Sequence, residues 1–360
     1  MGKSEDYAWS IDSHDEREGI FTLFPGNTFL NRSALRIGWR AWCTLNRINA
    51  DFLAICGYQG AFTLMALLWA KMHGKIAVMM SDSSYGDQTR SYWREWGKRQ
   101  IVSRFDAALV AGRRQKEYAA FLGIPAKRIF LGYDVVDNEH FSQEAAVVRQ
   151  KAEFYRQQGG LPQRYFLTVS RFIGKKNLPF LLEAYMRYRR MAVTHHWDLV
   201  LCGSGPMEAG LREQAGQMPG VHFPGFKQAS ELPIYYGLAS TFIIPSSHNE
   251  QWGLVVNEAM ACGLPVLVSR ACGCAQDLVQ EGVNGFTFDP HDVDALARLL
   301  LRISSGQMDL AAMGQASRNI ISAYTPETFA ANLLAAIKNS LAALGRKAKN
   351  QGSEPCDFSV

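Results

Sequence analysis

Short apolar runs of strand length alternate with helix-patterned segments along almost the whole chain. The strand-like runs form two series, at residues 19–24, 50–56, 75–80, 107–112 and 128–133, and then at 164–170, 197–203, 220–226, 241–247, 264–269 and 285–289. Helical patterns lie between them, for example at 177–190 and 292–303. Strands that alternate with helices predict βαβ units and parallel sheets, and continuous apolar strands fit sheets that are covered on both faces.

A polar segment at residues 143–165 separates the two strand series and ends in Gly-Gly and a proline, as a domain boundary often does. We therefore predict an α/β protein with two doubly wound Rossmann-like domains that face each other across a cleft. Ligands of such sheets bind at the carboxyl ends of the strands. The predicted ranges are a first domain at 1–160, a second domain at 161–325, a C-terminal helix at 326–345 that packs back on the first domain, and a disordered tail at 346–360.

Charge and cysteine content exclude several classes of protein. A net charge of +5 over 360 residues is mild and does not indicate a nucleic-acid partner. The seven cysteines are scattered, which is typical of reduced thiols in a cytoplasmic protein. Cys272 and Cys274 have no second pair at ligand spacing, so we expect no metal site. The longest apolar stretch is too short to span a bilayer.

The segment NEQWGLVVNEAMACGLPVLVS at 249–269 indicates a binding site. It reads as a loop after a strand, followed by a helix with Gly253 at its start. A helix start offers free N–H groups and a positive dipole end, and Gly253 and Leu254 would bring the backbone close to an anion such as a diphosphate. Glu250 and Glu258 lie on either side of that pocket, and carboxylates accept hydrogen bonds from sugar hydroxyls. The pattern therefore predicts a nucleotide sugar.

This spacing resembles the E-x7-E motif of retaining glycosyltransferases of family 4, which have the GT-B fold. Four other segments match that family in order: SRFIGKKN, LCGSGPMEAGL, VHFPGFKQASELPIYYGLAS and SRACGCAQDLVQEGVNGFTFDP. The resemblance covers residues 100 to 340. It implies that Arg171 and Lys176 bind phosphate, and that Gly203 and Gly205 form the turn beside the donor.

The resemblance implies a transfer in which the configuration of the sugar is retained. The donor's own phosphate helps to remove the acceptor proton, and the protein positions the reactants and stabilises the leaving diphosphate. It assigns Arg171, Lys176 and Glu250 to catalysis. Donor binding falls to Gly203, Gly205, Gly253, Leu254 and Glu258. It implies a UDP-sugar as substrate, no cofactor and no metal, because two cations and a helix end can replace a divalent ion.

The metal-binding alternative rests on Asp292 and Asp294, which form a D-x-D sequence. Their position after a proline and before a helix predicts capping instead. His222 is expected to pack beside its strand, and His248 lies close enough to the site loop to contact a ligand.

The match is poorest at the N-terminus, on the acceptor side. The run at 19–24 already resembles a later strand, so the first domain is expected to lack its initial βα unit. Where the family often has a histidine, this chain has Ser81 and Asp82, and we assign Asp82 to the acceptor side. The acceptor is a glycan, a lipid-linked sugar or a small molecule of polysaccharide or glycoconjugate biosynthesis.

The segment RSYWREWGKRQIVSRF at 90–105 combines basic residues with tryptophans. Basic charge beside Trp93 and Trp96 is typical of a membrane-surface helix, with Arg90, Arg94 and Lys98 facing anionic lipid. The alternative is a solvated helix face. A peripheral site on the inner face of the membrane would be compatible with a cytoplasmic protein.

Two other functions remain open. Some nucleotide-sugar epimerases share the two-domain fold, and they need no acceptor. The expected lack of the first βα unit also allows a protein that binds nucleotide without efficient turnover.

Overall fold

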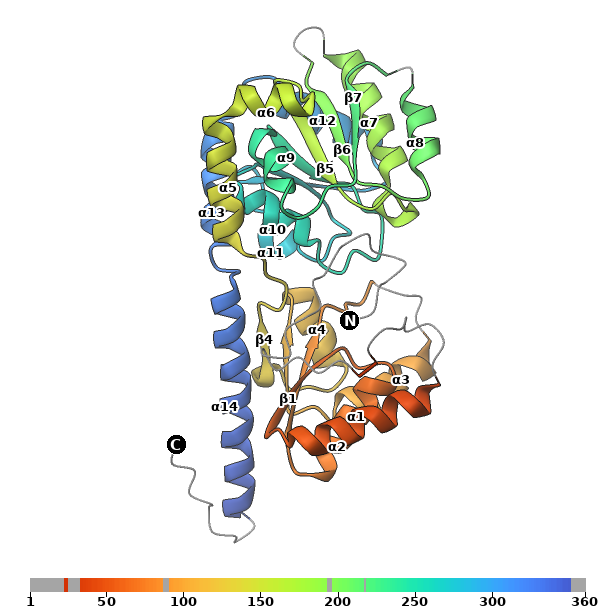
Figure 1. Ribbon diagram of the computed structural model, residues 1–360, viewed down its shortest axis with the longest axis vertical. Coiled ribbons are helices and arrows are strands. Elements are labelled where there is room, and N and C mark those ends of the chain that lie inside the picture. The colour runs from red at the N-terminus through yellow and green to blue at the C-terminus, as the bar shows by residue number, and fades with distance from the viewer. Residues whose placement is uncertain (1–22, 25–32, 87–90, 193–195, 217, 351–360) are drawn as a thin grey trace.

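The computed structural model describes residues 23–24, 33–86, 91–192, 196–216 and 218–350. They form two parallel-sheet α/β domains, one above the other in Figure 1, with a long C-terminal helix along the lower one. The predicted fold class is confirmed. Of the predicted strand at 19–24, only Leu23 and Phe24 are described, and they form a bend. The expected lack of an initial βα unit concerns residues that mostly lie outside the described ranges.

The first domain has a four-stranded parallel sheet in the order β1-β2-β3-β4. Its elements are α1 (Ala34–Ile48), β1 (Phe52–Cys56), α2 (Ala61–Met72), β2 (Ile76–Ser81), α3 (Tyr92–Val102), β3 (Ala107–Val110), α4 (Arg113–Phe121) and β4 (Ile129–Leu131). The strands advance in one direction, and right-handed crossovers then bring their connecting helices to one face. That face includes Ala77 and Met79, which pack with residues of all four helices.

The other face of this sheet is covered by the C-terminal helix α14 (Pro326–Asn350). Ile76, Val78 and Ala107 alternate with the residues of the first face and pack against Ala336 and Ile337 of α14. Figure 1 shows this helix descending from the upper domain along the lower one. The helix continues to Asn350, past the predicted end at 345, so the first part of the predicted disordered tail is helical. Residues 351–360 lie outside the described ranges.

The second domain has a six-stranded parallel sheet in the order β10-β9-β8-β5-β6-β7. Its elements from β5 onwards are β5 (Tyr165–Val169), α7 (Leu178–Met191), β6 (Asp198–Cys202), α8 (Glu208–Ala215), β7 (Val221–Gly225), α9 (Leu232–Leu238), β8 (Thr241–Ile244), α10 (Leu254–Ala261), β9 (Val266–Ser269), α11 (Ala275–Leu278), β10 (Gly285–Phe288), α12 (Val293–Ser304) and α13 (Leu310–Ile321). The strand order reverses between β5 and β8. Loops that leave these two strands in opposite directions open a crevice for ligands.

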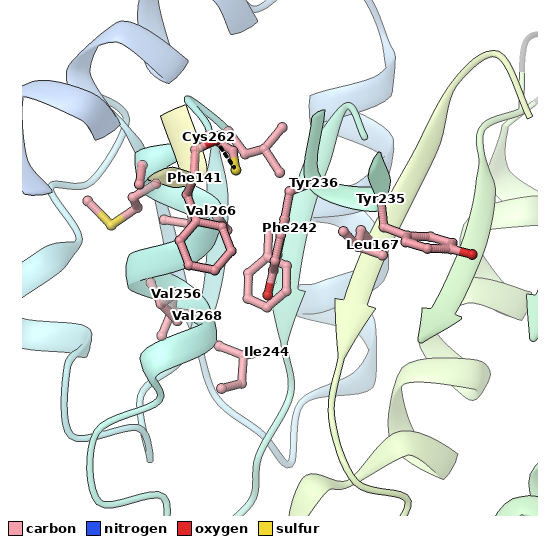
Figure 2. Packing of buried hydrophobic residues seen from close by; sticks show 14 of the residues in the cluster. Phe141, Leu167, Tyr235, Tyr236, Phe242, Ile244, Val256, Cys262, Val266 and Val268 are labelled. Atoms are coloured by element: carbon pink, nitrogen blue, oxygen red, sulfur yellow. Dashed lines mark hydrogen bonds between the residues drawn. The ribbon is translucent and has the colours of Figure 1, made fainter. Parts of the chain in front are cut away.

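Both faces of the second sheet are buried, and side chains alternate between them. In β5, Tyr165 and Leu167 face one cluster while Phe166 faces the other. The first cluster also includes Phe141, Ala145 and Val148 of α5 (Asn138–Gln150). Figure 2 shows Phe141 beside Tyr236 and Phe242, with its ring centre 6.1 Å from that of Tyr236.

The helices α5 and α6 (Ala152–Gly159) therefore pack with the second sheet, although the sequence analysis assigned residues up to 160 to the first domain. The polar surface of this segment resembled a linker, but one apolar stripe is buried against α9 and α10. By packing, the second domain begins before α5. The chain returns to the first domain at α14.

Candidate functional site

The helix α10 begins at Gly253, directly after the loop that leaves β8. Gly253 is its N-cap residue, with φ at 104°, and no side chain caps this end among the described residues. A Cβ atom at this position would lie 3.2 Å from Cδ1 of Ile244. The left-handed backbone therefore favours glycine, and the first turn is left open for an anion. Leu254 is 41% exposed beside it.

Glu250 lies in the same loop and is held from two sides. Its carboxylate pairs with the ammonium group of Lys176 and accepts a hydrogen bond of 2.8 Å from Oγ of Ser246. The side chains of Lys176 and Glu250 are only 13% and 10% exposed. The structure thus joins two predicted site residues in one ion pair at the start of α10.

Lys176 ends a short 3-10 turn (Gly174–Lys176) that follows β5. The neighbouring Lys175 ties this turn to the β8 loop, because its Nζ donates to the carbonyl of Asn249 at 3.0 Å. The amide of Ser247 donates to the carbonyl of Lys175 at 2.9 Å. The sequence analysis did not identify Lys175. The feature that could have indicated it is its position next to Lys176.

Arg171 lies in the same β5 loop and is partly buried. Gly203 and Gly205 follow β6 and lie directly against this loop. A Cβ atom on Gly203 would lie 1.8 Å from the carbonyl oxygen of Ser170, and one on Gly205 would lie 2.6 Å from that of Phe172. The two glycines therefore allow the β6 loop to support the loop that carries Arg171.

Glu258 lies one turn into α10, and its carboxylate accepts a hydrogen bond of 2.6 Å from the hydroxyl of Tyr236. Tyr236 is fully buried. Burial raises the pKa of Glu258 to about 7, although the hydrogen bond from Tyr236 acts in the opposite direction. The sequence analysis did not identify Tyr236, whose nearest signal was the YY pair in the segment 232–238.

The carboxyl-end loops of the two sheets meet beside Glu250, and we call this region the interdomain junction. Asp82, which follows β2, accepts a hydrogen bond of 3.1 Å from the side-chain amide of Gln251. Asn257 of α10 donates to the carbonyl of Asp134 at 3.1 Å. Burial, and then the charge of Asp82, raise the pKa of Asp134 to about 7. Asp134 was missed, although an acidic residue after a strand at a sheet's carboxyl edge was the signal.

Of the two aspartates of the D-x-D sequence, Asp292 has the predicted capping role, whereas Asp294 makes an ion pair that was not predicted. Asp292 caps α12 by accepting a hydrogen bond of 2.8 Å from the amide of Ala295, and Asp294 pairs with Arg187 at 2.6 Å. His222 lies 2.7 Å from Asp198, and His248 contacts the hydroxyl of Ser247 at 2.7 Å. Within the described part of the chain, no three His, Cys, Asp or Glu residues are grouped to hold a metal ion.

The basic helix α3 differs from its prediction in one respect. Lys98 pairs with Glu95 at 2.9 Å and donates to the hydroxyl of Tyr118 at 3.0 Å, so it faces the domain rather than solvent. Trp93 and Trp96 are 75% and 54% exposed. Arg90 lies outside the described residues. No helix in the described ranges is both long and apolar enough to cross a bilayer.

The two facing α/β domains and the open helix start define the GT-B class of fold, which solved structures share. A glycosyltransferase from Rickettsia africae ESF-5 covers 91% of this chain and 86% of its own, with a TM-score of 0.74 and 16% identity. The Anabaena protein HepE in complex with UDP covers 86% and 82%, with a TM-score of 0.65 and 18% identity.

Residues 151–350 match the family model described as glycosyl transferases group 1, and this chain belongs to that family. A D-inositol 3-phosphate glycosyltransferase of Salinispora arenicola (strain CNS-205) is 27% identical over 304 residues, which are 79% of this chain and 66% of that protein. The chain spans 38 to 66% of the lengths of the first three curated relatives that it matches. The match to the family model makes the chain a member of a glycosyltransferase family, and the relatives named above give no support to the epimerase alternative.

Proposed function

We propose that the protein is a retaining glycosyltransferase that moves a sugar from a nucleotide-sugar donor to an acceptor hydroxyl. The proposed donor is a UDP-sugar. The observation that carries this proposal is the Lys176–Glu250 ion pair at the open start of α10. The helix start and the cation can bind a diphosphate, and the neighbouring carboxylate can accept hydrogen bonds from the hydroxyl groups of the attached sugar. The UDP bound by HepE supports the choice of nucleotide.

In this proposal the donor diphosphate lies at Gly253 and Leu254, and Lys176 and Arg171 share its charge. Glu250 accepts hydrogen bonds from the transferred sugar, and Glu258 accepts them from the ribose. As the glycosidic bond breaks, negative charge grows on the leaving diphosphate, and fixed cations stabilise that charge. The leaving phosphate takes the acceptor proton on the same face, so the configuration is retained without a protein nucleophile.

The acceptor is proposed to bind from the first domain, near Asp82. The raised pKa of Asp134 supports this position, because a protonated and an ionised carboxyl group together can both donate to and accept from hydroxyl groups. The acceptor is proposed to be a glycan, a lipid-linked sugar or a small polyol.

A reversible contact with anionic lipid is proposed for α3 through Trp93, Trp96 and Arg94. The exposure of both tryptophans supports it, whereas the inward position of Lys98 reduces the charge available. Each basic residue near anionic lipid contributes about 1 kcal/mol, screened by salt. Sedimentation with anionic vesicles, compared with a Trp93→Ser, Trp96→Ser variant, tests this contact.

The central test is a screen of UDP-, GDP- and ADP-sugars for donor hydrolysis and for transfer, with and without EDTA. We expect one donor class to turn over with EDTA present and to give a product of the donor's anomeric configuration. An inverted product would overturn the mechanism. Loss of activity with EDTA that magnesium or manganese restores would overturn metal independence. If calorimetry showed nucleotide binding but no acceptor gave turnover, the result would favour the alternative of a protein that binds nucleotide without efficient catalysis.

A further inference from the structure

The start of α4 in the first domain lies directly against the loops that carry the site in the second domain. Gly112 precedes the helix, and a Cβ atom on it would lie 2.5 Å from Oδ2 of Asp277 and 2.6 Å from Cζ3 of Trp252. No larger residue fits there unless the side chains of Asp277 and Trp252 move away. The amide of Arg113 donates to the carboxylate of Asp277 at 3.2 Å.

Gln115, in the first turn of α4, reaches the residue that follows Glu250. Its side chain is 1% exposed, and its Nε2 donates to the carbonyl oxygen of Gln251 at 2.7 Å. The side chain of Gln251 in turn donates to Asp82 at 3.1 Å. Gln251 is therefore held by the first domain through both its backbone and its side chain.

Arg114 holds the adjacent loop after β9 in a similar way. Its guanidinium donates to the carbonyl oxygens of Arg270 at 2.9 Å and of Cys272 at 3.3 Å. The β9 loop then contacts the β8 loop, because the amide of Gly273 donates to the carbonyl of Glu250 at 2.9 Å. The carbonyl groups of Glu250 and Gln251 are thus both held, the first through the β9 loop that Arg114 binds and the second directly by Gln115.

The polarity of Gln115 is not explained by packing alone. Its Oε1 is buried and has no hydrogen-bond partner among the described residues. A buried polar atom without a partner destabilises the folded state, and an apolar side chain of the same length would avoid that loss. The feature that an apolar side chain lacks is the N–H group that bonds to Gln251.

We propose that Gln115, assisted by Arg114, is a positioning residue for Glu250, so that the first domain sets the geometry of the donor side of the site. The inference rests on the proposed role of Glu250 in catalysis. Glu250 can contact the donor sugar only if its loop keeps its place relative to Lys176 and the start of α10. Misplacement of a reacting group by 1 Å can lower a rate by about 10²-fold, so a hydrogen bond between domains can control turnover.

Gln115→Met tests this inference, because methionine has similar length and volume but no N–H donor. The control is Gln143→Met on α5, where the exposed glutamine donates to Glu139 of its own helix at 2.7 Å. We expect Gln115→Met to lower kcat by at least about tenfold, with the dissociation constant for UDP changed less than about threefold. Gln143→Met should leave both values unchanged.

Hydrogen exchange of residues 246–254 supplies a readout that does not depend on activity. We expect faster exchange in Gln115→Met and in Arg114→Met than in the wild type, while the midpoint of thermal unfolding stays close to that of the control. A kcat for Gln115→Met within twofold of the wild type would overturn the inference, as would equal losses in kcat and UDP affinity. If the wild type itself turned over no donor, the proposed function would fail, and unchanged exchange would then also overturn the positioning role.

Discussion

Two carboxyl groups of the site region, on Glu258 and Asp134, keep their protons to unusually high pH. For both groups burial is the main cause, since a buried carboxylate loses its hydration. For Asp134 the negative charge of Asp82 adds to this effect. The charge of the site therefore changes near neutral pH, where carboxyl groups on a protein surface are already ionised.

The first expected consequence concerns nucleotide binding by Glu258. Ionised Glu258 accepts hydrogen bonds from ribose hydroxyls better than the protonated acid does. With a pKa of about 7, UDP affinity should increase from pH 6 to pH 8 by up to about tenfold. Glu258→Gln should bind UDP more weakly, by about 1.5–3 kcal/mol at the higher pH, and should lose this pH dependence. Calorimetry across this range measures both effects, and equal affinities for the two proteins would remove Glu258 from the site.

The second consequence concerns stability and Asp134. Between its ordinary pKa of 3.8 and its raised value of about 7, the unfolded chain is ionised while the folded protein keeps the proton. The folded state then binds more protons, so the free energy of unfolding decreases as pH rises through this window. Asp134→Asn removes the titration. As pH rises from 5 to 8, the free energy of unfolding of the variant should therefore increase relative to that of the wild type, by on the order of 1–3 kcal/mol.

Urea unfolding at several pH values measures this difference. The control is Asp51→Asn, whose carboxylate pairs with Lys75 and is 88% exposed. That change should leave the pH dependence of stability as it is in the wild type. A stability difference for Asp134→Asn that is constant with pH would show that Asp134 ionises normally.

At the scale of elements, the site depends on how α10 begins. The loop after β8 turns into α10 at Gly253, whose φ of 104° lies in the left-handed region. Lys175 and the β9 loop hold the preceding residues from either side. The open helix start, the ion pair of Glu250 and the turn that carries Lys176 are therefore parts of one loop assembly around the carboxyl ends of β5, β8 and β9.

Gly253→Ala tests this assembly. The new methyl group meets Ile244 at 3.2 Å, and alanine is strained at this φ. We expect a loss of about 1–2 kcal/mol in stability together with weaker UDP binding. Gly210→Ala in α8 is the matched control, because its Cβ atom meets no atom within 4 Å and helical alanine is favoured. Unfolding and binding measured on both proteins give the comparison, and equal behaviour would show that the helix start does not require glycine.

At the scale of the whole molecule, α14 links the two domains. It leaves α13 in the second domain and completes the first domain, because the described strands of that sheet place their connecting helices on the other face. The first sheet is therefore a two-sided layer only when α14 is in place. Its folding depends on a helix that is encoded about 200 residues later than β4.

Ala336→Asp should disturb the first domain selectively. Ala336 is fully buried against Ile76, Val78 and Ala107. An unpaired carboxylate at this position should therefore destabilise the first domain by roughly 3–5 kcal/mol. Ala331→Asp, at an exposed position of the same helix, is the control. We expect calorimetry to show an early transition for the first domain in Ala336→Asp only, followed by the second domain. A single unshifted transition would mean that α14 is not required.

The sequence by itself determined the strands of the two described sheets, helices such as α7, α10 and α12, and the family, because these follow from local periodicity and from motifs of adjacent residues. The runs that predicted β1 to β10 are the observed strands, and Gly253 begins the helix assigned to it. Glu250 and Lys176 were both proposed as site residues from the family motifs. Their ion pair joins positions 74 residues apart and was not part of that prediction.

Only the tertiary structure decided which surfaces meet. The apolar stripe of α5 predicts that one face is buried, but it does not specify the sheet that covers it, and the predicted domain boundary at 160 was misplaced for that reason. The contacts of Tyr236 with Glu258 and of Gln115 with Gln251 could not be predicted from the sequence for the same reason. A pattern of burial is encoded locally, whereas the partner of a buried face depends on the packing of segments that are distant in the chain.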